Sequence, residues 1–137
     1  WIDTGKKDPL LESNRLILET LEPANLGEVD AESSIEGRVV IQEGARIVRS
    51  RVRGPAIIGE GTVIEGSYIG PYSSVSHRCT IRDSELDHSV VLEDSTIVDV
   101  PRLTDSLVGR NVDVRRSHEK PAAVRLMLGD HSSVDLA

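Results

Sequence analysis

Aromatic side chains are almost absent from this chain of 137 residues: they make up 2% of it, and phenylalanine does not occur. A core without large rings is unusual for a globular domain of this size, and it favours a narrow interior filled by aliphatic side chains. Cysteine is equally scarce. The single Cys79 excludes an internal disulfide and is typical of a reducing compartment, so we expect a cytoplasmic protein.

Basic residues are also few, with 16 Lys and Arg against 23 Asp and Glu and a formal net charge of −7. A binder of nucleic acid needs a basic face, so no nucleic-acid partner is predicted. No apolar run approaches the ~20 residues that span a membrane, so no membrane partner is predicted either. The sequence carries no secretory signal pattern. Because it opens on Trp1 rather than on methionine, we expect it to be part of a longer protein.

One fixed spacing recurs through the middle of the chain, and we call it the repeat interval. It separates Ile35 from Val52 and Val52 from Ile69, and apolar residues follow it in three interleaved sets. Each repeat therefore offers three inward side chains, which is the pattern of a triangular solenoid with short strands as its faces. We predict an all-β fold, a parallel β-helix of about five coils preceded by one α-helix. The expected inward positions are Ile35, Ile41, Ile47, Val52, Ile58, Ile64, Ile69, Val75, Ile81, Leu86, Leu92, Val98, Leu103, Val108 and Val114.

Small or turn-forming residues mark the corners between these faces. One corner is predicted at Ser33, Ser50, Ser67, Ser84 and Pro101, each two residues before an inward position. A second corner is predicted at Gly44, Gly61, Arg78, Ser95 and Asn111. Glycine and asparagine tolerate a positive φ, whereas arginine and serine fit such a corner less well.

The flanking segments differ in character from the repeats. Residues 1–24 contain Asp8 and Pro9, a helix start, followed by an apolar stripe of roughly helical period that ends before Pro23. Residues 25–32 are acidic and unpatterned, which predicts a linker before the β-helix at 33–117. The ends of a solenoid expose strand edges, so we expect residues 118–137 to form a capping tail, with a strand at 124–128.

Two motifs carry a resemblance to a known family. The pairs Ile58-Gly59, Ile69-Gly70 and Val108-Gly109 resemble the hexapeptide repeats of left-handed β-helices, although general crossover rules favour the opposite hand. Residues 1–5 (Trp-Ile-Asp-Thr-Gly) and 10–14 (Leu-Leu-Glu-Ser-Asn) resemble the end of a sugar-1-phosphate nucleotidylyltransferase catalytic domain. In this order, and with residues 126–130, they are most similar to the long glucose-1-phosphate thymidylyltransferases.

The resemblance implies a magnesium-dependent enzyme that joins dTTP and glucose 1-phosphate and releases pyrophosphate. It implies that Asp3 is a metal ligand, and Trp1 is expected to pack on a preceding nucleotidyltransferase domain, the first partner that we predict. The glycine-rich nucleotide loop and the second metal aspartate of that family have no counterpart here. We therefore predict that this chain alone is inactive, contributes no catalytic or cofactor-binding residue, and serves structure, homo-oligomer contacts or regulation.

Three other hypotheses remain at this point. Hexapeptide-repeat acyltransferases use a surface histidine as a base toward acyl-CoA, which makes His77 and His88 candidates, with carboxylates at Asp83, Asp87 and Asp94 nearby.

An outward arginine series, Arg46, Arg49, Arg51 and Arg53, is a solvated face or an anion or subunit site. A purely structural or ice-binding β-helix would need a ladder of identical outward residues, and the outward residues here are mixed. Cys79 is expected to be a buried filler, and His118 and His131 lack metal-ligand spacing.

Overall fold

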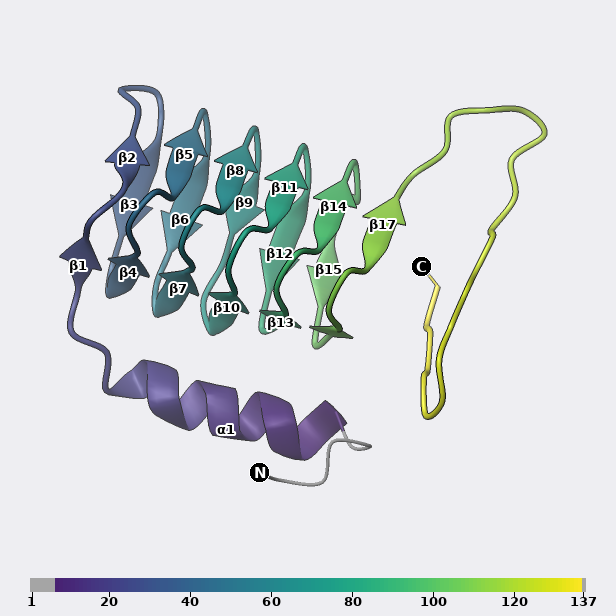
Figure 1. Cartoon of the computed structure of the whole chain (residues 1–137), viewed down its shortest axis with the longest axis horizontal. Coiled ribbons are helices and arrows are strands. Elements are labelled where there is room, and N and C mark those ends of the chain that lie inside the picture. Colours follow the sequence, from purple (N-terminus) through teal and green to yellow (C-terminus); the bar gives the residue numbers. More distant parts are fainter. Residues whose placement is uncertain (1–6, 137) are drawn as a thin grey trace.

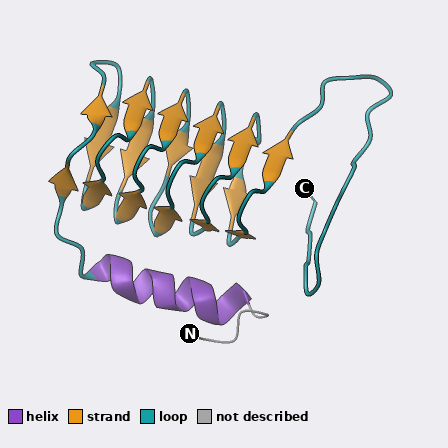
Figure 2. Ribbon diagram, viewed as in Figure 1, coloured by secondary structure: helices purple, strands orange, loops and turns teal. Residues whose placement is uncertain are grey.

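The computed structural model describes residues 7–136, which form one helix and a stack of short strands (Figure 1). Helix α1 (Lys7–Glu19) precedes the strands and runs along the outside of the stack (Figure 2). Sheet A contains β1 (Ala24–Asn25), β4 (Val39–Ile41), β7 (Ala56–Ile58), β10 (Ser73–Val75), β13 (Val90–Val91) and β16 (Leu107–Val108). Sheet B contains β2 (Glu28–Val29), β5 (Arg46–Val48), β8 (Val63–Glu65), β11 (Thr80–Arg82), β14 (Thr96–Val98) and β17 (Asp113–Arg115). Sheet C contains β3 (Ser34–Glu36), β6 (Arg51–Arg53), β9 (Tyr68–Ile69), β12 (Glu85–Asp87) and β15 (Leu103–Thr104).

Each strand pairs in parallel with the strand one coil later, so successive coils stack along a single axis. Val52 pairs with Ile69, and Ile64 pairs with Ile81, and both pairs are separated by the repeat interval. In Figure 1 the chain rises through sheet B, descends behind it through sheet C and returns through sheet A, which is a left-handed path. The left-handed parallel β-helix of about five coils is thereby confirmed.

The interior is a column of aliphatic side chains, as the period predicted. Thirteen of the fifteen expected inward residues belong to this core, which fills a space too narrow for aromatic rings. The buried members are Ile41, Ile47, Val52, Ile58, Ile64, Ile69, Val75, Ile81, Leu86 and Val108, and the partly buried members are Ile35, Leu103 and Val114.

The prediction of an inward side chain was wrong at two positions, Leu92 and Val98. The structure buries Val91 and Ile97, whereas their neighbours Leu92 and Val98 lie half-exposed on the outer surface. Val75 pairs with Val91, one residue less than the repeat interval, because the coil that follows β12 enters sheet A one residue early. Side chains alternate across a strand, so a slip of one residue exchanges the inward and outward faces.

The same slip moves two of the predicted corner residues. Asp94 and not Ser95 adopts the positive φ, at 62°, that Gly44, Gly61 and Arg78 adopt in earlier coils. At the corner before sheet C, Val100 and not Pro101 follows Ser84, and its backbone N–H donates to the Ser84 hydroxyl at 3.0 Å. Asn111 adopts a positive φ of 55°, as expected.

A ladder of serine hydroxyls fastens the corner before sheet C. The backbone N–H groups of Ser50, Ser67 and Ser84 each donate to the hydroxyl of the serine one coil earlier, at 3.0, 3.0 and 3.1 Å. The hydroxyls of Ser50, Ser67 and Ser84 each donate in turn to the carbonyl two residues before them, at 2.7 to 2.8 Å. Because the corner is buried, these hydroxyls satisfy backbone N–H groups that water does not reach.

We expect Ser67→Ala to lower the free energy of unfolding by about 1–3 kcal/mol, because it leaves the buried N–H of Ser84 without its acceptor. Urea unfolding followed by circular dichroism measures the change. Ser74→Ala is the matched control, since Ser74 lies outward on sheet A and its hydroxyl makes no hydrogen bond within the described chain. Equal losses in both variants would contradict the role of the ladder.

The two ends of the β-helix differ from expectation. Residues 25–32, expected as a linker, hold the last residue of β1 and the whole of β2, and these strands pair with β4 and β5 and begin the first coil. Residues 124–128, expected as a strand, form none, and the apolar side chains of Val124, Leu126 and Leu128 are exposed. Alternation of apolar residues alone does not make a strand without a partner edge.

Helix α1 is fixed along the edge where sheets C and A meet. Its Leu18 is fully buried, and Asn14 Nδ2 donates to the carbonyl of Tyr72 at 3.3 Å. At its end, Arg38 Nη1 donates to the carbonyl of Glu19 at 2.5 Å. The expected apolar stripe is split, because Leu16 and Ile17 of the same helix are 58% and 60% exposed and face away from the β-helix.

Candidate functional site

The predicted metal ligand Asp3 and the predicted packing residue Trp1 lie outside the described residues, so the structure does not test either role. Within residues 7–136, no group of three or more His, Cys, Asp or Glu side chains is arranged to hold a metal ion. In the same range, no helix has the length and apolar character needed to cross a bilayer.

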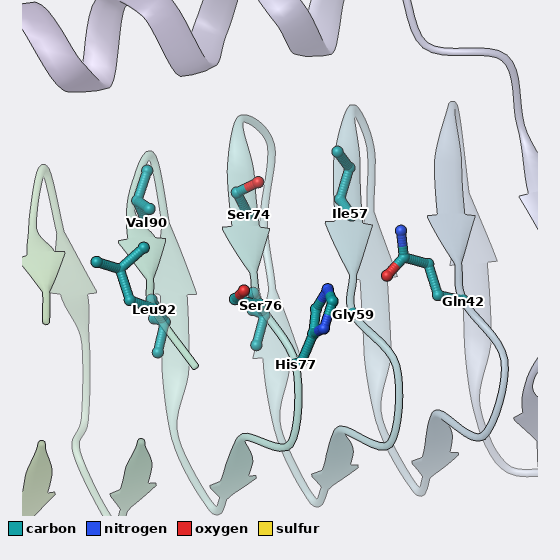
Figure 3. A pocket seen from close by; sticks show the side chains of 10 residues that line it. Gln42, Ile57, Gly59, Ser74, Ser76, His77, Val90 and Leu92 are labelled. Atoms are coloured by element: carbon teal, nitrogen blue, oxygen red, sulfur yellow. The ribbon is translucent and has the colours of Figure 1, made fainter. Parts of the chain in front are cut away.

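A shallow hollow of about 160 Å³ lies on the outer surface of sheet A (Figure 3). Outward side chains of β7, β10 and β13 form its floor, and His77 stands at its rim beside Ser76 and Gly59. The floor is exposed because three neighbouring coils place only small or aliphatic residues there, among them Ile57 and Ser74. The hollow is smaller than the roughly 300–1,000 Å³ of typical small-molecule sites.

His77, the first candidate base, lacks the partner that base catalysis requires. No hydrogen bond to its ring exists within the described chain, and it is exposed. Asp94, whose backbone N–H donates to the carbonyl of His77, has its carboxylate engaged elsewhere and accepts from Arg78 Nε at 2.8 Å. This hydrogen bond lowers the pKa of Asp94, so its carboxylate is engaged and ionised. A general base needs a group that orients its ring, and no such dyad is formed here.

His88, the second candidate base, has a packing role. Its ring stacks on Tyr72 with centroids 5.4 Å apart, and the guanidinium of Arg15 lies 5.1 Å from the centre of the Tyr72 ring. The three side chains thus join helix α1 to the edge of the β-helix through stacking and cation–π contacts. Asp87 accepts from Arg102 at 2.7 Å, and within the described chain neither Asp83 nor Asp87 forms a hydrogen bond with the ring of His88. His118, in the tail, contacts Asp99.

Cys79 is buried and free, as predicted. Its thiol lies 3.2 Å from the carbonyl oxygen of Leu92, at the corner position that Thr62 and Ser95 occupy in neighbouring coils. Burial raises the pKa of the Cys79 thiol, so little thiolate forms near neutral pH. A nucleophilic cysteine needs the opposite environment.

We expect the Cys79 thiol of the folded chain to react with a disulfide reagent at pH 8 at least ~100-fold more slowly than after unfolding in guanidinium. The raised pKa keeps the thiol protonated, and burial excludes the reagent. Stopped-flow absorbance measures both rates. Arg46→Cys, exposed on sheet B, is the control for a freely reactive thiol in the folded state. Rapid reaction of native Cys79 would contradict this assignment.

The four outward arginines divide between two faces. Arg46 and Arg49 lie at sheet B and the corner after it, where they pair with Glu28 at 3.7 Å and Glu65 at 2.9 Å. Arg51 and Arg53 lie on β6 of sheet C, exposed, and neither forms an ion pair with another described residue. The sequence presented all four as one outward series, although the predicted corner at Ser50 separates the first two arginines from the last two.

The chain is similar in sequence to several known enzymes. No protein-family model matches the chain. A glucose-1-phosphate thymidylyltransferase of Streptomyces antibioticus is 50% identical over 99% of this chain. A bifunctional sugar-1-phosphate nucleotidylyltransferase/acetyltransferase of Sulfurisphaera tokodaii is 33% identical over 82% of this chain and 29% of its own length. The solved acetyltransferase domain of PglB from Neisseria gonorrhoeae covers 88% of this chain and 67% of its own, with 12% identity and a TM-score of 0.42.

The coverage of the thymidylyltransferases is one-sided. This chain spans 38% and 39% of the length of the two Streptomyces enzymes that it matches at 50% and 47% identity, and it is covered by them almost from end to end. The low structural similarity of the acetyltransferase domain adds nothing to this relationship. By sequence, therefore, the chain belongs with the carboxyl-terminal region of the glucose-1-phosphate thymidylyltransferases.

Proposed function

We propose that the intact protein is a glucose-1-phosphate thymidylyltransferase and that this chain is its assembly domain. The observation that carries the proposal is the 50% identity to such an enzyme along 99% of the chain. In this reaction a phosphate oxygen of glucose 1-phosphate attacks the α-phosphorus of dTTP. The bond to the β-phosphate breaks, dTDP-glucose forms and pyrophosphate leaves.

Asp3 is the residue of this chain proposed to take part in that chemistry. A carboxylate oxygen is the ligand type that Mg²⁺ prefers, and a magnesium ion supplies charge neutralisation to the triphosphate when bound. One carboxylate does not make a magnesium site, and the described residues offer no further cluster. The remaining ligands and the nucleotide pocket are therefore proposed to lie in a preceding nucleotidyltransferase domain.

The described residues suit a role in assembly better than a role in catalysis. Within the described chain, His77 has no orienting hydrogen bond, His88 stacks on Tyr72, and Cys79 is buried. The hollows on sheets A and C are shallow and open. What they provide is a rigid prism with flat outer faces, to which helix α1 is fastened through Arg38, Asn14 and the stacked Arg15 and Tyr72. The exposed Leu16 and Ile17 of α1 are proposed to pack against the preceding domain.

The test compares the intact enzyme with this chain. We expect the intact enzyme to form dTDP-glucose from dTTP and glucose 1-phosphate with Mg²⁺, and this chain to form none. In the intact enzyme, Asp3→Asn should lower kcat/KM by more than about 100-fold, whereas Glu12→Gln, exposed on α1, should leave it unchanged.

Acyl transfer is the competing function, and calorimetry with acetyl-CoA tests it directly. We expect no heat of binding from this chain. Micromolar binding that is lost in His77→Ala would favour an acyltransferase and overturn the assembly role, because the hollow beside His77 would then hold a ligand.

A further inference from the structure

The outer surface of sheet C, which we call face C, carries its charges in an ordered pattern. Outward side chains form two columns along the axis of the β-helix, set by the strand register. The first column runs Ser34, Arg51, Tyr68, Glu85 and Arg102, and the second runs Glu36, Arg53, Gly70, Asp87 and Thr104. Basic residues therefore occupy β6 and acidic residues occupy β12, with the uncharged β9 between them.

Face C is open in this chain. Arg51, Arg53 and Glu85 are exposed and line a hollow with Tyr68 and Glu36. Helix α1 lies along the edge shared with sheet A and leaves this face free (Figure 1). Neither Arg51 nor Arg53 forms an ion pair with another described residue. Elsewhere in the fold, arginines do pair with carboxylates of the next coil, as Arg49 does with Glu65 and Arg78 with Asp94.

We propose that face C binds a second copy of this chain across a two-fold axis that runs parallel to β9. Such an axis places β6 of one copy opposite β12 of the other and β9 opposite its own copy. Arg51 then faces the exposed Glu85 of the other copy, and Tyr68 faces Tyr68. Arg53 faces Asp87, which also accepts a hydrogen bond from Arg102 of its own copy. Each charge contact occurs twice and the Tyr68 pair lies on the axis, as a two-fold interface requires.

The charge pattern selects this axis over the alternatives. A two-fold axis parallel to the long axis of the β-helix would place β6 of one copy opposite β6 of the other. The guanidinium groups of Arg51 and Arg53 from both copies would then lie together. An axis between β6 and β9 would bring Glu36 opposite Asp87. Like charges in direct apposition cost association free energy, so only the axis at β9 joins opposite charges on both sides of it.

Flatness and size also suit a second copy. Gly70 occupies the position beside Tyr68 on β9, and a Cβ there would lie 3.0 Å from Tyr68 Cε2, so the ring lies low across the glycine. Five strands about 4.8 Å apart and about six residues wide give the face roughly 500 Å². A dimer would bury about 1,000 Å² in total, which predicts a weak and salt-sensitive association.

This interface rests on the assembly role proposed above, and the first experiment separates the two. Sedimentation equilibrium of this chain over a range of concentrations should show a reversible dimer. Arg51→Glu should weaken dimerisation by at least about tenfold, because each dimer exchanges two attractions for two repulsions. The double variant Arg51→Glu with Glu85→Arg should restore it, since the charges are only exchanged.

Arg46→Glu is the matched control, because it makes the same change in net charge on sheet B. A wild-type chain that stays monomeric at all concentrations would overturn both the interface and its assembly role. A dimer that is insensitive to Arg51→Glu, or equally sensitive to Arg46→Glu, would overturn the interface alone.

A second experiment locates the axis. Tyr68→Cys places one thiol on each copy directly across the proposed axis, and a short bis-maleimide should link the copies within minutes. Arg46→Cys, on a different face, should not link, and the native Cys79 is buried. Linking of Arg46→Cys as fast as Tyr68→Cys would show that face C is not the interface.

Discussion

Replacement of Ile64 by alanine is expected to lower the free energy of unfolding by about 2–5 kcal/mol. Ile64 is fully buried on β8, between Ile47 of the preceding coil and Ile81 of the following coil. Hydrogen-bonded strands fix the spacing of these neighbours, so the walls of the prism cannot close around the missing side chain. The residual cavity adds its own cost to the lost transfer free energy.

The position of Ile64 makes the effect larger than at the ends. In a linear stack each coil contacts only its neighbours, so a defect in a middle coil weakens both halves. Val114→Ala, on the last strand β17, should therefore cost less, because no coil follows it. Urea titration monitored by circular dichroism gives the free energies of unfolding.

Ile17→Ala is the matched control for the chemical change. Ile17 is 60% exposed on α1, and alanine has the higher helix propensity, so stability should change by less than about 0.5 kcal/mol. A loss at Ile17 that equals the loss at Ile64 would show that the aliphatic column is not what holds the β-helix together.

The core was predictable because a β-helix repeats the same geometric constraint in every coil. Where an inward position carries an isolated aliphatic residue, as at Val52 and Ile69, the repeat interval identifies it. Where two or three apolar residues are adjacent, as at 90–92 and 97–98, the repeat interval favours the wrong one, because the coil there has lost a residue.

A second signal in the sequence could have located that slip. The residue two places before an inward position is small in most coils, as at Thr62 before Ile64 and Ser73 before Val75. Ser89 precedes Val91 and Ser95 precedes Ile97 by the same two places, and both serines are buried. Only small side chains fit the inside of a corner, so these serines indicate the true register.

The surfaces were less predictable than the core. Charge columns on face C follow the repeat interval in the sequence, as Arg51 and Glu85 flank Tyr68 by that interval on each side. Whether these charged side chains form ion pairs depends on which partners the corners bring within reach, and the sequence alone does not determine this. The exposure of Leu16 and Ile17 likewise depends on the path of α1 along the β-helix, which no period determines.

Gly59→Ala is expected to destabilise the chain by about 3 kcal/mol or more, since overpacking between rigid coils displaces the backbone. A Cβ at Gly59 would lie 2.4 Å from both the carbonyl carbon and the carbonyl oxygen of Ser76 in the next coil. Real Cβ atoms do not approach backbone atoms this closely, so the coils must separate. The hydrogen bond from the N–H of Gly59 to the carbonyl of Val75, at 2.8 Å, would then be strained or lost.

Gly109 provides a control within the same column of sheet A. It follows Val108 as Gly59 follows Ile58, but no coil lies beyond it, and the nearest atom to its Cβ position is Val112 Cγ2 at 3.7 Å. Gly109→Ala should therefore be neutral or slightly stabilising, because alanine reduces the entropy of the unfolded chain. If both variants lost stability equally, the cause would be a conformational need for glycine. A loss confined to Gly59 would show that close stacking of the coils sets the requirement, and chemical unfolding of the two variants separates these outcomes.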